Sequence, residues 1–264
     1  MKTYGVAVSA RFVWTVLAFV FLLAPIAVLI FASFDDASFF RFPPNSYSLR
    51  WYEAAVESLE YRSALSVSLL VAALAGFIAV FFGAMAAFAL VRYKPAGGRI
   101  VEAILMTPLV LPLIVWAIAL LQIYSRLGMS GTLPALVLAH AVITMPFSVR
   151  IMVSTFADLD PLLEQAAATL GASPGRVVRR ITLPLAMPGL VSSAAFSVLI
   201  SFNDVIVSSL IAGARWITFP VRLYAQLRSQ GIDPMTLAIG SAIVAFILVA
   251  ALIGEFMFKW SRRL

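Results

Sequence analysis

The sequence has no cysteine, only one histidine and few charged residues. Without cysteine there are no disulfide bonds and no thiolate ligands for a metal ion. Charged residues make up 12% of the 264 residues and hydrophobic residues 62%, and the mean hydropathy is +1.02. A chain of this length with so few charges cannot cover a soluble globule with polar surface. The composition therefore predicts a membrane protein.

Nucleotide-binding motifs are also missing. There is no Gly-x-x-x-x-Gly-Lys-Ser/Thr loop and no soluble nucleotide-binding unit, so we expect no catalytic residues and no cofactor in this chain. With one histidine and no cysteine, we predict no metal site. The net charge of +7 does not indicate nucleic acid, because Lys and Arg lie mostly at the ends of apolar runs, where membrane topology requires them.

What the sequence does contain is a series of apolar runs, each about 20 residues or longer, the length of a helix that crosses a hydrocarbon core. The runs are too long for barrel strands, and a helix satisfies its own backbone hydrogen bonds in lipid. We predict an all-α membrane protein with six transmembrane helices in one domain, residues 1–264. The predicted spans are 12–33, which we interpret as an uncleaved signal anchor, 64–91, 100–124, 133–156, 185–212 and 235–258.

The distribution of Lys and Arg predicts the orientation. With the N-terminus inside, twelve of the 19 basic residues lie on or near the cytoplasmic side and seven lie outside. The twelve are Lys2, Arg11, Arg92, Lys94, Arg99, Arg150, Arg176, Arg179, Arg180, Lys259, Arg262 and Arg263; the seven are Arg41, Arg50, Arg62, Arg126, Arg215, Arg222 and Arg228. Both termini and the polar segment 157–184 are then cytoplasmic. The external segments 34–62 and 213–234 are each predicted to contain a short helix, and either can meet a soluble receptor or lie at the lipid headgroups.

The polar segment 157–184 carries a spaced motif. Gln165-Ala166-Ala167 is followed after three residues by Gly171, and after nine more by Ile181-Thr182-Leu183-Pro184. The pattern resembles the cytoplasmic coupling loop, or EAA loop, of ABC importer permeases. Those proteins usually have Glu where this chain has Gln165, and Glu164 stands one position earlier. The resemblance implies the type I ABC importer permease fold and contact with an ATPase subunit through Glu164, Gln165, Ala166, Ala167, Gly171, Ala172, Ser173, Ile181, Leu183 and Pro184.

Local propensities predict the shape of this loop. Residues 163–170 favour a helix, Gly171 permits a turn that other residues disfavour, and Ser173 followed by Pro174 suits the start of a second helix. The alanines form a small, smooth face that fits a groove on a partner. Three nearby arginines can pair with acids of the partner or with anionic lipid. The alternative is an ordinary amphipathic helix lying on the bilayer.

Polar residues within the spans are the candidates for a solute path. A charge at Asp204 costs a few kcal/mol in a membrane unless it faces a cavity or is paired, so it either contacts a cationic solute or forms a polar clamp with Asn203 between permeases. His140 is interpreted as a hydrogen-bonding packing residue, with a proton relay or metal ligand as the alternative. Trp116 and Tyr124 can line a path near the outer face, although such residues also belong at membrane interfaces.

A second resemblance concerns the solute. Residues 145–150, 183–189 and above all 201–209 (Ser-Phe-Asn-Asp-Val-Ile-Val-Ser-Ser) look like permeases of bacterial spermidine/putrescine importers of the second-permease type. Where that subgroup commonly has two acids, this chain has Asn203 and Asp204. A single carboxylate also suits a monoamine, a zwitterion such as an amino acid derivative, or another small organic solute.

This resemblance also implies the assembly. The partners would be a second, similar permease or another copy of this chain, two ATPase subunits that bind ATP and Mg, an extracytoplasmic solute-binding protein, and the lipid of a bacterial inner membrane. Two other classes remain open. One is a stand-alone channel or proton-coupled carrier, and the other is an intramembrane enzyme, for which only Asp204 and His140 are available.

Overall fold

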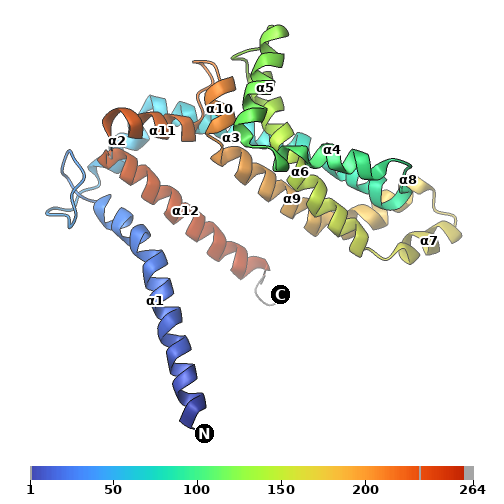
Figure 1. The fold of residues 1–264 in the computed structure, drawn as a ribbon, viewed down its shortest axis with the longest axis horizontal. Coiled ribbons are helices and arrows are strands. Elements are labelled where there is room, and N and C mark those ends of the chain that lie inside the picture. The colour runs from blue at the N-terminus through green and yellow to red at the C-terminus, as the bar shows by residue number, and fades with distance from the viewer. Residues whose placement is uncertain (1, 232, 259–264) are drawn as a thin grey trace. The chain divides into compact units, whose positions relative to one another are not determined.

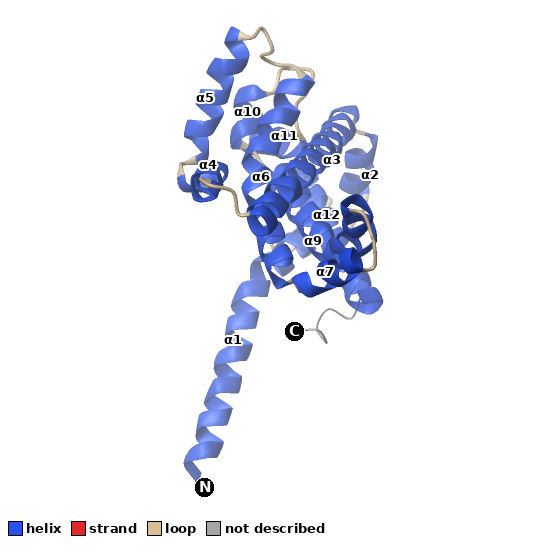
Figure 2. Cartoon of the chain, turned by 90° about the vertical axis from the view of Figure 1, so that its right-hand side faces the viewer, coloured by secondary structure: helices blue, strands red, loops and turns tan. Residues whose placement is uncertain are grey.

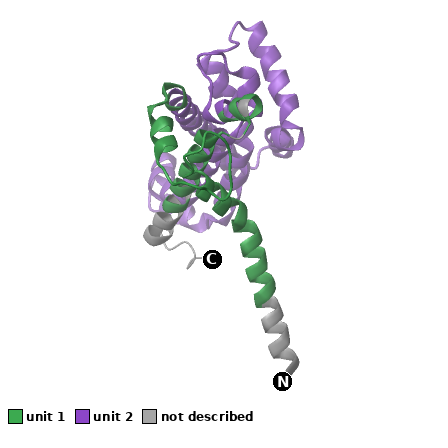
Figure 3. Ribbon diagram, turned by 90° about the vertical axis from the view of Figure 1, so that its left-hand side faces the viewer, with its two compact units in different colours: residues 1–62, 223–264 green, residues 63–222 purple. Residues whose placement is uncertain are grey.

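The computed structural model describes residues 2–231 and 233–258, and their regular secondary structure is helical (Figure 2). The chain forms two compact units, one made of residues 1–62 and 223–264 and the other of residues 63–222 (Figure 3). The basic residues Lys259, Arg262 and Arg263, and with them the predicted location of the C-terminus, lie outside the described residues.

The first unit contains α1 (Lys2–Ala32), α2 (Arg50–Glu57) and α12 (Pro234–Phe258). α12 packs against both α1 and α2. The Tyr52 hydroxyl on α2 joins the two longer helices, because it hydrogen-bonds to Ser33 at the end of α1 and to Ser241 on α12. The expected short helix is therefore present as α2, and it is hydrogen-bonded to the end of α1 and to the first half of α12.

The loop before α2 is held by its own polar contacts. Both carboxylate oxygens of the buried Asp35 accept hydrogen bonds of 3.0 Å from the Arg41 guanidinium, which lowers the pKa of Asp35 below its ordinary value. The Trp51 indole N–H donates to the Ala37 carbonyl at 3.1 Å. These contacts give the loop a fixed conformation although it contains no regular secondary structure beyond a single bridge between Asp35 and Tyr47.

The second unit carries the coupling segment and most of the apolar helices. Its elements are α3 (Leu59–Phe88) with the π-helical turn η1 (Ala89–Tyr93), α4 (Gly98–Val110), α5 (Leu113–Arg126), α6 (Leu133–Asp158), α7 (Pro161–Thr169), α8 (Pro174–Val177) with the π-helical turn η2 (Val178–Thr182), α9 (Leu183–Asn203), α10 (Ile206–Ile211) and the start of α11 (Phe219–Gln230). α11 is the helix expected in the external segment 213–234. Figure 1 shows α7 and α8 at one end of the neighbouring helices α6 and α9, and α5 and α10 near the other end.

α6 is the central helix of this unit. It is more deeply buried than the other apolar helices, and it packs chiefly on α9. Small residues allow the close approach: a Cβ added at Gly189 on α9 would lie 2.1 Å from Thr155 Oγ1, and one added at Gly83 on α3 would lie 2.5 Å from Ser148 Oγ. The Ser193 hydroxyl on α9 donates to the Ser148 hydroxyl on α6 at 2.7 Å. Small residues and hydroxyl pairs are the usual means of joining helices in lipid, where burial of apolar surface gives no net drive.

The predicted span 100–124 is not one straight helix. α4 and α5 meet at an angle of 106°, with the break at Leu111 and Pro112. The cause lies in the backbone, since a proline lacks the N–H that a continuing helix needs and pushes the preceding residue into an extended conformation. Leu111 accordingly has φ −85° and ψ 147°. Hydropathy predicted one apolar span here and could not predict its bend.

The predicted span 185–212 is broken as well. α9 ends at Asn203, Asp204 is extended (φ −72°, ψ 129°), and α10 begins at Ile206. Asp204, expected well inside a continuous helix, therefore lies at a helix break. The reason is local: its carboxylate accepts hydrogen bonds from the first backbone N–H groups of α10 and so favours a new helix start.

The number of membrane spans can be compared with the prediction of six. In the described parts of the chain four helical segments are long and apolar enough to cross a membrane, and the bent pair α4 and α5 would make a fifth. The first half of α12, residues 234–246, is a further apolar helix of shorter length. Six spans are compatible with this arrangement, and the exact number stays a prediction.

Candidate functional site

The motif residues around Gly171 form a helix-turn-helix. α7 begins after Asp160, whose side chain accepts a hydrogen bond of 2.9 Å from the Leu162 N–H, and it has proline at its first position. At its other end, the Ala172 N–H donates to the Ala167 carbonyl and the Gly171 N–H to the Ala168 carbonyl, both at 3.0 Å. This pair of bonds is the Schellman pattern.

Gly171 makes that turn possible. Its φ of +82° lies in the left-handed region, where a side chain is strained, as the sequence predicts for this position. A Cβ built there would have no other atom within 4 Å. Gly171 is therefore required for its backbone angle, and the chain itself leaves the space beside it empty.

The second short helix starts as the sequence predicts, with one difference. Ser173 is extended (φ −67°, ψ 153°), Pro174 follows at the first helical position, and the Ser173 carbonyl accepts from the N–H groups of Arg176 and Val177. The Ser173 hydroxyl makes no capping hydrogen bond, so its backbone rather than its side chain starts the helix. Ile181 in η2 is partly buried, and η2 leads directly into α9, where Leu183 and Pro184 are exposed.

One face of α7 is exposed and largely apolar. Leu162, Ala166 and Leu170 follow each other at intervals of four and lie along one side of the helix. Leu162 is 63% exposed and Leu170 is 90% exposed, and Gln165 beside them is also exposed. An apolar ridge with a small residue at its centre suits a groove on another protein. Leu170, which family spacing does not mark, is the most prominent part of this ridge.

The Glu164 side chain points away from this ridge and contacts other residues of the same chain. Its Oε1 accepts hydrogen bonds from Arg92 Nε (3.3 Å), Arg92 Nη2 (3.2 Å) and Thr182 Oγ1 (2.8 Å). Glu164, which precedes the motif residues Gln165-Ala166-Ala167, is therefore already paired within this chain. Gln165, where related permeases usually have Glu, is uncharged and exposed. Sequence reasoning missed Arg92 and Thr182 because they are distant along the chain from Glu164.

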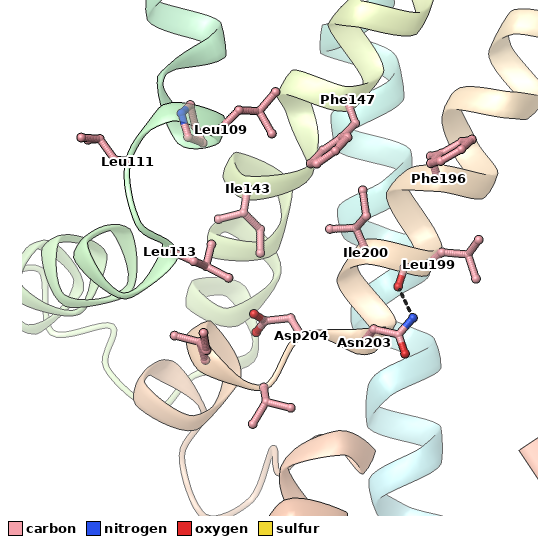
Figure 4. Close-up of a pocket in the computed structure, with 13 residues that line it drawn as sticks. Leu109, Leu111, Leu113, Ile143, Phe147, Phe196, Leu199, Ile200, Asn203 and Asp204 are labelled. Carbon is pink, nitrogen blue, oxygen red and sulfur yellow. Dashed lines mark hydrogen bonds between the residues drawn. The ribbon is translucent and has the colours of Figure 1, made fainter. Parts of the chain in front are cut away.

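The pocket that Asp204 lines is formed at both helix breaks. It has a volume of about 770 Å³ and opens between the α4–α5 bend, α6 and the α9–α10 break (Figure 4). Its walls are almost entirely apolar, with side chains such as Leu111, Ile143 and Phe196. Asn203 and Asp204 are the two polar residues on it. Broken helices bring backbone and polar groups to a cavity that continuous helices would line only with side chains.

Asp204 and Asn203 behave differently there. Asp204 is 7% exposed and points toward Leu113 and Ile143, whereas Asn203 points the other way and donates to the Leu199 carbonyl at 2.9 Å (Figure 4). Asp204 Oδ2 accepts from the Ser208 N–H at 2.8 Å and Oδ1 from the Val207 N–H at 3.3 Å. The two neighbours do not hydrogen-bond to each other, so within this chain they form no joint clamp.

His140 lies behind Asp204 in a polar cluster. The imidazole is completely buried on α6, with Nδ1 2.7 Å from Ser201 Oγ and Nε2 3.0 Å from Ser208 Oγ. Its Nε2 is also 3.7 Å from Asp204 Oδ2. Both ring nitrogens are therefore engaged, and the cluster joins α6 to both sides of the α9–α10 break. This geometry agrees with the interpretation of His140 as a hydrogen-bonding packing residue.

Trp116 and Tyr124, the other candidates for the path, lie on α5 and do not line this pocket. Tyr124 is 7% exposed and packs in an apolar cluster with Leu120 and Leu136. The buried indole N–H of Trp116 has no hydrogen-bond partner among the described residues. The assignment of both to a solute path stays a prediction.

Comparison with known proteins agrees with these features. Residues 79–263 match the model of the family described as binding-protein-dependent transport system inner membrane component. The chain belongs to this family. The matched residues include the whole coupling motif and the pocket.

Several named relatives are similar to this permease over nearly its full length. The spermidine/putrescine permease PotC of Escherichia coli K12 is 30% identical over 239 residues, 90% of this chain and 89% of that protein. The putrescine permease PotI of the same strain is 29% identical over 254 residues, 94% of this chain and 90% of that protein. The putative 2-aminoethylphosphonate permease PhnV of Salmonella choleraesuis SC-B67 is 28% identical over 254 residues, 96% of this chain and 95% of that protein.

Solved structures show the same fold. A chain of a bacterial ABC transporter involved in import of the acidic polysaccharide alginate superposes with a TM-score of 0.74 at 14% identity, covering 97% of this permease and 98% of that chain. A chain of the methionine ABC transporter MetNI has a TM-score of 0.60 at 22% identity, covering 76% of this permease and 98% of that chain. The permease is thus an all-α membrane protein with the type I ABC importer permease fold.

Proposed function

We propose that this permease is the transmembrane subunit of an ATP-driven, binding-protein-dependent importer of a small solute with a primary ammonium group, most specifically a polyamine such as putrescine or spermidine. Two facts support the proposal. The three relatives described above share a chemical group in the solutes they are named for, because spermidine, putrescine and 2-aminoethylphosphonate all carry a primary amine. The pocket at the helix breaks presents one carboxylate, Asp204, in a wall that is apolar except for Asp204 and the uncharged Asn203.

The Asp204 carboxylate is the single observation that carries the choice of solute. A buried carboxylate attracts an ammonium group more strongly than one in water, because less solvent screens the pair. The apolar remainder of the pocket suits the methylene chain of a polyamine. The uncharged Asn203 beside Asp204 leaves one acid where two would hold two ammonium groups, so a monoamine or a zwitterion such as an amino acid derivative is the alternative solute.

The assembly proposed for transport has further subunits. The permease pairs with a second homologous permease or with another copy of itself, and the solute path runs between them. Two ATPase subunits bind ATP and Mg and dock on α7 and α8, and an extracytoplasmic solute-binding protein delivers the solute. In this assembly the permease spans the bacterial inner membrane with both termini cytoplasmic, contacts lipid, and performs no chemistry itself.

ATP binding closes the ATPase pair and moves the docked segments, and the spanning helices then change from inward-open to outward-open. The outward-open state receives solute from the receptor, and hydrolysis resets the path. α7 suits this role because its exposed ridge of Leu162, Ala166 and Leu170 offers an apolar contact surface. Trp116 and Tyr124 on α5 are proposed to lie farther along the path.

The complete importer, reconstituted in vesicles with its receptor, tests the proposal. Uptake of radiolabelled putrescine should require ATP and should compete with spermidine, but not with 1,4-butanediol, which has the same length without the ammonium groups. Competition by 2-aminoethylphosphonate alone would favour a zwitterionic solute. Solute flux that persists without ATP or ATPase subunits would instead support a channel or carrier and contradict the importer.

A further inference from the structure

The coupling segment is joined to three apolar helices at one polar contact. Glu164 on α7 binds Arg92, which lies in η1 at the end of α3, and Thr182, which lies in η2 at the start of α9. The Arg92 guanidinium also donates from Nη2 to the Leu159 carbonyl at 3.3 Å, directly after α6. One carboxylate oxygen and one guanidinium thus hold the ends of α3, α6 and α9 to α7.

The contact is partly shielded from solvent. The side chain of Arg92 is 14% exposed and that of Glu164 is 21% exposed, while Thr182 is buried. Ala87, Met152, Phe156 and Ala186 form an apolar cluster from the same three helices, and Val91, next to Arg92 in the sequence, packs against it. The polar contact therefore adjoins packed apolar side chains, and a movement of its atoms disturbs that packing.

The two partners of Glu164 share an unusual backbone. Both lie in π-helical turns: η1 ends α3, and η2 joins α8 to α9. A π-helical turn inserts an extra residue and is often found at functional positions. Here the turns place Arg92 and Thr182 on either side of one carboxylate, although 90 residues separate them in the sequence.

We propose that Glu164, Arg92 and Thr182 are positioning residues that make α7 and the adjoining ends of α3, α6 and α9 move as one rigid lever. This rests on the proposed docking of α7 on an ATPase. The exposed ridge receives the displacement, and the Glu164 contact transmits it. The Glu164 carboxylate therefore acts through contacts within the permease. The next position, where related permeases usually have Glu, is occupied by the uncharged Gln165.

The test uses the complete importer in vesicles and measures solute transported per ATP hydrolysed. Glu164→Gln and Arg92→Gln keep the ridge on α7 and remove the ion pair. We expect each to lower this ratio by about threefold or more, within the range of about 0.5 to 2 kcal/mol found for couplings between sites. ATP hydrolysis per assembled complex should persist, because the docking ridge is unchanged. The double variant should be no worse than the poorer single one.

A charge exchange separates a specific contact from a general disturbance. Glu164→Arg with Arg92→Glu should recover part of the ratio that each reversed single charge loses. Arg99→Gln is the matched control, since Arg99 on α4 is exposed and forms no ion pair among the described residues, and it should leave the ratio near that of the parent. Where a charge-removing variant does not assemble, Thr182→Val removes only the hydroxyl, and it too should lower the ratio.

The results that would contradict the lever differ from those that would contradict the docking of α7 on an ATPase subunit. The lever proposal would be wrong if Glu164→Gln or Thr182→Val transported as much solute per ATP as the parent. It would also be wrong if the effects of removing the charges at Glu164 and Arg92 were independent and additive. If instead an Ala166→Arg variant retained its ATPase subunits and normal transport, the docking surface proposed on α7 would be wrong, whatever the result at Glu164.

Discussion

Replacing Asp204 by asparagine removes a charge from the pocket while keeping nearly the same volume. Two unit charges 4 Å apart attract each other by about 4 kcal/mol near a protein surface, and if about a third of this survives desolvation of the ammonium group, the loss is about 1.4 kcal/mol. Such a loss corresponds to a rise of about tenfold in the apparent KM for a cationic solute. The maximal rate should change less, because the coupling segment is untouched.

The substitution also has a structural cost that must be measured separately. Asp204 accepts from two backbone N–H groups, those of Val207 and Ser208, and an asparagine side chain retains one carbonyl oxygen. A buried N–H left without a partner costs about 1 to 3 kcal/mol, so the variant should be somewhat less stable. Ser208→Ala is the control, because it removes a hydroxyl that contacts His140 and leaves the carboxylate in place.

The assay is the concentration dependence of uptake in vesicles, normalised to the amount of intact complex. A parental KM in an Asp204→Asn complex that assembles normally would refute the recognition role. A lower yield of complex with an unchanged KM would show that Asp204 acts as a structural contact, either at the start of α10 or between permeases. A similar rise of KM in Ser208→Ala would also contradict the reasoning, because the charge would then not be the cause.

Three further predictions concern the turn, the packing and the topology. Gly171→Asp should abolish transport while the complex stays inserted, since the chain leaves room for the side chain and only a partner would contact it. The control is Gly128→Asp, at a turn with φ +67° and equal space, which should reduce uptake much less in the same assay. Gly189→Ala should lower thermal stability in detergent by about 1 to 3 kcal/mol through its clash with Thr155, because overpacking forces helices apart. A reporter after Leu264 should be cytoplasmic and one near Asn45 external, and reporters found on the same side would contradict the six-span topology.

The sequence predicted those features that depend on local patterns. Apolar length indicated a helical membrane protein, and the motif around Gly171 predicted a helix, a left-handed turn and a second short helix, all of which are present. Such features follow from hydropathy and from the backbone preferences of Gly, Ser and Pro. They need no knowledge of contacts between distant residues.

The features that the sequence did not predict depend on three-dimensional geometry. The bend at Leu111 and Pro112 lies in an apolar run with two prolines, and the sequence does not tell that the helix breaks at Pro112 and continues through Pro108. The break at Asp204 depends on hydrogen bonds to α10 and on His140 from another helix. The pairing of Glu164 with Arg92 joins residues 72 positions apart, which no spacing rule in a single sequence reveals.

The docking of α7 on an ATPase subunit can be measured directly because the chain has no cysteine. Leu170→Cys, at a position 90% exposed, can carry a photoactivated crosslinker in the complete importer, and Phe77→Cys on α3, at a position 70% exposed, provides a matched control on an apolar helix. We predict a crosslink from position 170 to the ATPase subunit that changes in yield on addition of ATP, and none to that subunit from position 77. Crosslinks from position 170 only to lipid, or to the solute-binding protein, would contradict the proposal that this permease is driven through α7.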